Sequence, residues 1–200
     1  VLGDITWYAG DLDKTRRQGE IGLALSRRLG SLRFEGEILA YLGRVAWKDG
    51  SRDEATQLFD DGLKLTREAG MLYAGAEVLA GIARFTDDRD LRRATLDEGR
   101  EILATGACVS HDYFHYFQFA IEIMIKEGNW DGTVEYGRQL AAYTEAEPLP
   151  WAEFFIDRGN ALAAWGRGEH SPQAVTRIRR IQKVGADAGI TMTYPALEKT

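Results

Sequence analysis

The chain has 200 residues, of which 44 % are hydrophobic and 28 % charged, so it carries enough apolar side chains to bury a core. No apolar run approaches the roughly 18 residues that cross a bilayer, which excludes a membrane-spanning helix. The net charge of −6 argues against nucleic acid as a partner. Cys108 is the only cysteine, so an intrachain disulfide is excluded and a cytoplasmic location is expected. The start at Val1, with no signal peptide, predicts a piece of a longer protein.

Glycines recur along the chain at a period of about 39–40 residues. One series stands just before the second helix of each predicted pair and comprises Gly10, Gly50, Gly128 and Gly168. A second series, at the other end of each repeat, is Gly30, Gly70, Gly106 and Gly189. A fixed period of this length is typical of helical repeats. The sequence therefore predicts one domain over residues 1–200, with repeats at 1–30, 31–70, 71–106, 107–147 and 148–189.

Apolar residues at helical spacing predict two helices in each repeat. The expected ranges are 1–9, 12–29, 33–49, 52–69, 72–86, 90–105, 111–127, 130–146, 150–167 and 171–188. Ser51, followed by Glu54, indicates a capping box, and Gly70 indicates a helix stop. The aromatic segment 113–119 has strand propensity, but its apolar residues continue at helical spacing towards Gly128, so a helix is expected there.

Two helices of this length cannot bury their apolar faces alone, whereas stacked pairs can. The predicted fold is therefore all-α, a right-handed α-α superhelix of about five helix-turn-helix units. Small residues favour close helix crossings, because a larger side chain would push the helices apart. The candidates for such crossings are Gly43, Ala55, Gly62 and Gly81.

The second repeat resembles the tetratricopeptide repeat (TPR). The residues that carry the resemblance are Leu42, Gly43, Ala55, Phe59 and Gly62. The family's usual proline is absent, and the period exceeds its 34 residues. The segments 147–156 (EPLPWAEFFI) and 161–168, with 79–84 and 106–111, are similar to the C-terminal repeat region of large bacterial signalling proteins. Those proteins carry an adenylate/guanylate cyclase domain and an AAA-type ATPase module. The resemblance implies a regulatory or interaction segment without catalytic residues.

Candidate metal ligands have a competing structural explanation. Cys108, His111 and His115 have the spacing C-x2-H-x3-H, which suits a metal, but they also fit a helix start with two packed histidines. The acidic run 87–90 suits a cation or the cap of the next helix. The basic run 177–183 reads as a solvated helix face or a nucleic-acid contact. We expect no metal, no cofactor and no catalytic site, and therefore no enzyme.

Several charged and aromatic residues recur with the repeat. Glu37 and Glu77 are 40 residues apart, as are Arg44 and Arg84. Each of three tryptophans precedes a repeat glycine by three residues, and these are core wedges or the border of a concave groove: Trp7, Trp47 and Trp165. The residues predicted to contact a partner on the concave face are Glu37, Arg44, Trp47, Lys48, Glu77, Arg84, His115 and Glu122.

The sequence favours a non-catalytic scaffold that binds a protein or peptide partner, or other domains of its parent chain, on the concave face. An alternative is self-association or intramolecular packing, including a homodimer, through an end of the superhelix that exposes Ile5, Trp7 and Leu12. A second alternative is a small-molecule sensor with a pocket near Tyr113, His115 and Trp151. No nucleic acid and no membrane are expected as partners.

Overall fold

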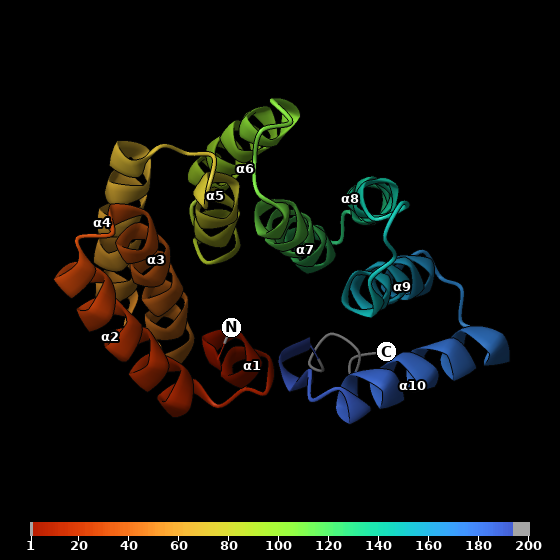
Figure 1. Cartoon of the computed structure of the whole chain (residues 1–200). Coiled ribbons are helices and arrows are strands. Elements are labelled where there is room, and N and C mark those ends of the chain that lie inside the picture. The colour runs from red at the N-terminus through yellow and green to blue at the C-terminus, as the bar shows by residue number, and fades with distance from the viewer. Residues whose placement is uncertain (1, 194–200) are drawn as a thin grey trace. The chain divides into compact units, whose positions relative to one another are not determined.

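Ten α-helices and one short 3-10 helix make up the described part of the computed structural model, which covers residues 2–193, with side chains from Asp4 to Met192 (Figure 1). No strand occurs within these residues. The elements are α1 (Leu2–Tyr8), α2 (Leu12–Leu29), α3 (Leu32–Asp49), α4 (Arg52–Ala69), α5 (Gly75–Arg84), α6 (Arg89–Ala104), α7 (Ser110–Glu127), α8 (Trp130–Tyr143), α9 (Pro150–Gly166), α10 (Pro172–Asp187) and η1 (Thr191–Thr193). The all-helical fold and the order of the helices are confirmed.

The aromatic segment 113–119 lies within α7, which confirms that its helical spacing outweighs its strand propensity. α5 starts at Gly75, later than the expected residue 72, because the chain first makes a turn in which the Gly75 N–H donates to the Met71 carbonyl at 3.0 Å. None of the helices in the described part of the chain has the length and apolarity that spanning a bilayer requires.

The helix ends follow the sequence signals, with one exception. Gly50 ends α3 with φ 95°, a left-handed conformation that glycine adopts without steric cost. Asn129 caps α8 by accepting a hydrogen bond from the Gly132 N–H at 3.0 Å. The predicted capping box at Ser51 is wrong, because the Ser51 side chain makes no capping hydrogen bond. Instead, Asp49 accepts a hydrogen bond from the Ser51 N–H at 3.2 Å.

The helices group into two compact units. Within the described residues, the N-terminal lobe comprises 2–7 and 11–116, and the C-terminal lobe comprises 8–10 and 117–193. In the N-terminal lobe each helix from α2 to α6 packs against the next, and α3 also packs against α5. The single repeat domain expected over residues 1–200 stays a prediction.

Glycines allow the closest helix contact of the N-terminal lobe, between α3 and α4. A Cβ atom on Gly62 would lie 2.8 Å from the Gly36 carbonyl oxygen and 2.9 Å from the Ala40 nitrogen. A Cβ on Gly43 would lie 2.9 Å from the Phe59 ring. These distances leave no room for a side chain and confirm the predicted close crossing. Gly81 differs, because its Cβ would meet only the Arg44 side chain, at 3.9 Å.

Trp7 belongs to the core of the N-terminal lobe. Its side chain is 5 % exposed, with the rings of Tyr41 and Phe85 at 6.4 and 5.7 Å. The expectation that Trp7 lies exposed at an end of the superhelix is therefore wrong, since its large apolar area is buried among these rings. Ile5 is 62 % exposed, as that expectation requires, and Leu12 is half-buried.

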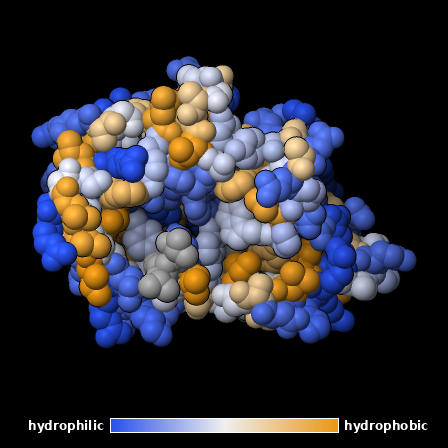
Figure 2. Space-filling view, viewed as in Figure 1, coloured by the Kyte–Doolittle hydropathy of each residue, from blue (hydrophilic) through white to orange (hydrophobic). Residues whose placement is uncertain are grey.

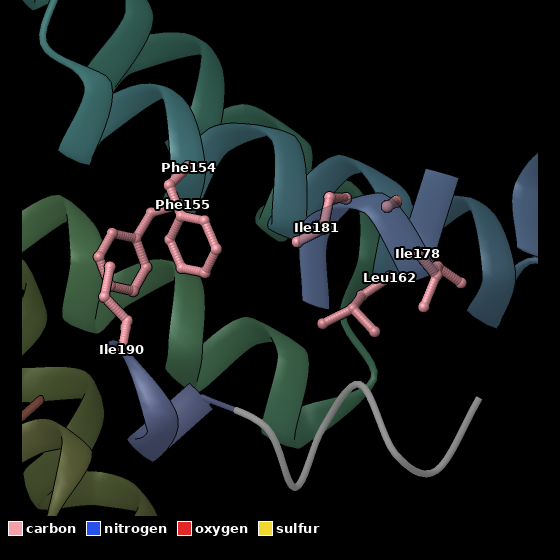
Figure 3. Packing of buried hydrophobic residues seen from close by; sticks show 7 residues of the cluster. Phe154, Phe155, Leu162, Ile178, Ile181 and Ile190 are labelled. Atoms are coloured by element: carbon pink, nitrogen blue, oxygen red, sulfur yellow. The ribbon is translucent and has the colours of Figure 1, made fainter. Parts of the chain in front are cut away.

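The C-terminal lobe has its own hydrophobic core, formed by α9, α10 and Ile190, the residue before η1 (Figure 3). The buried residues shown there include Phe154, Phe155, Leu162, Ile178, Ile181 and Ile190. The Tyr8 ring packs against Phe155 at 6.1 Å, and its hydroxyl donates a hydrogen bond to Gln118 at 3.2 Å. In this lobe α8 packs against α9, and α9 against α10.

Candidate functional site

Three helices of the N-terminal lobe bring acidic side chains and a histidine together. One ligand atom from each of Glu37, Glu77 and His111 lies within 4.8 Å of the other two. We call these three residues the carboxylate–histidine cluster. Glu37 lies in the second turn of α3, Glu77 in the first turn of α5 and His111 in the first turn of α7.

Hydrogen bonds hold the buried side of this cluster in place. Arg44, two turns beyond Glu37 on α3, donates a hydrogen bond to a Glu77 carboxylate oxygen at 2.9 Å. The two side chains are 5 % and 4 % exposed, so this is a fully buried ion pair between α3 and α5. Asp112 of α7 accepts a hydrogen bond from the Glu77 backbone N–H at 2.9 Å. The start of α5 is thereby tied to both neighbouring helices.

Burial and mutual repulsion shift the pKa values of these carboxyls. Burial, and then the charge of Glu77, raise the pKa of Glu37 to about 8, although Arg44 opposes this. Burial raises the pKa of Asp112 to about 7. Burial also opposes ionisation of Glu77, but His115 and Arg44 outweigh it and lower the pKa of Glu77. Glu77 is thus the anion of the cluster, while Glu37 holds a proton at neutral pH.

Two polar atoms next to the cluster are buried without a hydrogen-bond partner in the described part of the chain. They are Nε2 of His111 and one carboxyl oxygen, Oδ2, of Asp112, a residue that is 0 % exposed. Buried polar atoms in folded proteins are nearly always satisfied, so such atoms call for an explanation. Arg44 opposes the raised pKa of Glu37 and lowers the pKa of Glu77, so its guanidinium acts on both of these carboxyls.

Aromatic rings form a continuous row beside the cluster. The rings of Phe34 and Tyr73 meet edge to face at 5.3 Å, and those of Tyr73 and His111 at 5.0 Å. The Arg33 guanidinium lies 4.8 Å from the Phe34 ring and 4.7 Å from the Tyr73 ring. The three ring residues are 39 and 38 positions apart, close to the 39–40-residue period of the glycines.

Exposed aliphatic residues extend this row. Leu32, Leu72 and Val109 are 43 %, 46 % and 37 % exposed, and each lies at or just before the start of the first helix of its repeat. The Val109 N–H donates a hydrogen bond to the Leu72 carbonyl at 3.3 Å, which links the segments that precede α7 and α5. We call the following set the aromatic edge: Leu32, Phe34, Leu72, Tyr73, Val109 and His111.

The structure separates the eight residues predicted to contact a partner. Glu37, Arg44 and Glu77 meet at the cluster, and His115 lies close enough to Glu77 to lower its pKa. Arg44 and Glu77 form a buried ion pair with each other. A partner role stays a prediction for all eight.

The remaining four lie elsewhere. Lys48 is exposed at the end of α3, and the half-buried Trp47 lies under the Arg52 guanidinium at 3.6 Å. The Arg84 guanidinium lies 5.3 Å from the Phe85 ring. Glu122 belongs to the C-terminal lobe, where it pairs with Arg158. Trp165, the third repeat tryptophan, is half-buried and packs on His170 at 4.2 Å.

Cys108, His111 and His115, whose spacing suits a metal as well as packed histidines, do not gather as metal ligands in the described part of the chain. The Cys108 thiol donates to the Ile102 carbonyl at 3.6 Å, and burial raises its pKa. His111 joins Glu37 and Glu77 instead. The 40-residue interval relates Glu37 to Glu77, but His111 follows Glu77 by only 34 residues, so the period did not point to His111.

Two charged runs proved to have structural roles. Asp88, in the acidic run 87–90, caps α6 by accepting hydrogen bonds from the Asp90 and Leu91 N–H groups at 2.9 and 3.0 Å, which confirms the capping interpretation. In the basic run of α10, Arg177 and Arg180 pair with Asp157 of α9.

No protein-family model matches the chain, and no curated protein matches it significantly.

Proposed function

We propose that the chain is a non-catalytic interaction module, a TPR-like right-handed superhelix of about five repeats, that binds an extended segment of a protein partner along the aromatic edge. The observation that carries this proposal is the recurrence of exposed apolar residues at the same place in three successive repeats. Consecutive packing of the helices supports the repeat fold. The resemblance to bacterial cyclase–ATPase proteins suggests a regulatory segment of a larger cytoplasmic signalling protein as the context.

The form of the aromatic edge favours an extended occupant. Leu32, Leu72 and Val109 come from three different repeats, so a ligand that contacts all of them must run across α3, α5 and α7. Exposed apolar side chains that are gathered rather than scattered mark interaction surfaces. The stacked rings of Phe34 and Tyr73 are held by each other and by Arg33, so a bound segment would order few additional side chains.

The test uses peptides selected from a random display library against the purified chain. We expect selected peptides to lose at least tenfold in affinity, by fluorescence anisotropy, for the double variant Leu32→Ser/Leu72→Ser. The matched control, Leu91→Ser/Val184→Ser, removes two residues that are 43 % and 49 % exposed elsewhere, and should stay within twofold. Failure to select any peptide, or equal binding by both double variants, would refute the proposal.

Self-association is a second candidate because α2 carries an exposed apolar stripe. Ile21, Leu25 and Leu29 follow one another at intervals of four residues and are 63 %, 46 % and 69 % exposed. A hydrophobic band follows the side of the molecule where α2 lies in Figure 1 (Figure 2). Sedimentation velocity distinguishes the candidates. A dimer abolished by Ile21→Ser/Leu29→Ser would favour self-association, and a monomer at all concentrations would exclude it.

A further inference from the structure

We propose that Glu37, Glu77 and His111 form a binding site for a divalent transition-metal cation, with Zn²⁺ as the best match. Two carboxylates and one imidazole are a ligand set that zinc uses in proteins. The imidazole favours zinc and similar first-row cations over Mg²⁺ and Ca²⁺, which prefer oxygen ligands alone. The site lies in the N-terminal lobe and draws one ligand from each of α3, α5 and α7.

The geometry brings the three ligand atoms within reach of one ion. Because these atoms lie within 4.8 Å of one another, a point exists within about 2.8 Å of all three, the radius for an equilateral triangle of that side. Bonds from zinc to nitrogen or carboxylate oxygen measure about 2.0–2.2 Å. A movement of under about 1 Å for each side chain, well within the range of rotamer adjustment, therefore completes the coordination.

Neighbouring residues supply the outer contacts that metal sites use to orient their ligands. Arg44 holds the Glu77 carboxylate at 2.9 Å. Asp112 fixes the backbone of Glu77. The Tyr73 ring packs against the His111 imidazole at 5.0 Å and sets its position. Glu77, at 3 % exposure, forms the buried side of the site, while Glu37 and His111 are half-buried.

One observation beyond the gathered ligand atoms points to a cation. Nε2 of His111 is shielded from solvent and has no hydrogen-bond partner in the described residues, and an imidazole nitrogen is a ligand that zinc uses. Three protein ligands leave at least one coordination position for water, as in zinc sites that remain open.

The first experiment measures zinc binding by isothermal titration calorimetry on the whole chain after dialysis against a chelator. We expect saturable binding of one Zn²⁺ per chain and a rise in melting temperature with zinc concentration. Mg²⁺ at the same concentration should produce neither. Absence of zinc binding would overturn the proposal, and equal binding of Mg²⁺ would refute the assignment to a transition metal.

Variants then locate the ion. Glu37→Gln and His111→Ala should each weaken zinc binding at least tenfold, whereas the matched control His170→Ala, which removes an exposed histidine of the C-terminal lobe, should stay within twofold. Circular dichroism confirms that each variant is folded. Retention of zinc by both site variants, or its loss in His170→Ala, would overturn the assignment.

X-ray absorption spectroscopy of the zinc-loaded chain provides a readout independent of folding. The expected spectrum has oxygen and nitrogen neighbours with a single imidazole. A sulfur neighbour would assign the ion to Cys108 and refute the site. The variant Leu32→Ser/Leu72→Ser keeps all three ligands, so it should bind zinc normally even if it loses peptide binding, which separates this proposal from that of the aromatic edge.

Discussion

Replacement of Glu37 by glutamine should make the metal-free protein more stable at alkaline pH. Glutamine has the shape of a protonated glutamate but cannot ionise. In the folded chain, burial and the charges of Glu77 and Asp4 favour the protonated form of Glu37, against the opposing charge of Arg44. His111 also faces this carboxyl, through the cluster. The unfolded chain has none of these neighbours, so its Glu37 ionises at the usual pH.

The magnitude follows from the two pKa values. The pKa of Glu37 rises from 4.5 to about 8 on folding, which corresponds to at most about 5 kcal/mol. A group with a raised pKa in the folded state stabilises fully below its unfolded pKa and loses that contribution as pH climbs to the folded pKa. The parent chain should therefore lose stability relative to Glu37→Gln between pH 4.5 and 8, by up to about 1.4 kcal/mol per pH unit.

The assay is urea unfolding of both proteins at several pH values from 4.5 to 8.5, with chelator present throughout. The difference between them should be smallest near pH 4.5 and reach its maximum by pH 8. The glutamine amide needs hydrogen-bond partners in the folded chain, which lowers the stability of the variant by about 1–3 kcal/mol at every pH. The change of the stability difference with pH is therefore the decisive quantity. A difference that does not vary with pH would refute the claim that Glu37 is protonated in the folded chain.

Two further predictions concern packing and charge. Gly62→Ala should destabilise the chain by about 1–3 kcal/mol, because its Cβ would lie 2.8 Å from the Gly36 carbonyl oxygen; urea unfolding against Ala24→Gly, an exposed helix control, tests this, and a neutral result would contradict the close approach. Arg158→Ala should cost about 3–5 kcal/mol because it leaves Glu122 without its buried partner. Arg138→Ala breaks an exposed pair with Glu135 and should leave the unfolding curve unchanged. Similar curves for the two variants would show that the buried pair contributes nothing.

The helices were predictable from sequence because their apolar spacing and their glycines act locally. α7 illustrates this, since its helical face outweighs a strong local preference for strand. The capping box did not form because the Ser51 N–H donates to the Ala46 carbonyl and to Asp49, while Glu54 pairs with Arg16 of α2. The pattern of Ser51 and Glu54 contains no information about these competing partners.

The site was less predictable because it depends on contacts between repeats. The 40-residue interval showed that Glu37 and Glu77 are equivalent, but not that they approach each other. Arg44 was expected to be a surface charge, and only the packing of α3 on α5 shows that it is buried against Glu77. His111 was grouped with Cys108 by proximity along the chain, whereas its neighbours in space come from two other repeats.

The hydrogen bond from the Glu77 N–H to Asp112 means that the first turn of α5 is capped by a side chain from α7. Ala74 precedes α5 and has no side chain that can accept a hydrogen bond, so the acceptor comes from the next repeat. The first turn of α5 therefore depends on α7. A chain cut between residues 107 and 111 would keep every residue of α5 yet lose the acceptor for its first turn, and fraying would pass backward from the cut. Truncations that respect this dependence must end beyond the first turns of α7.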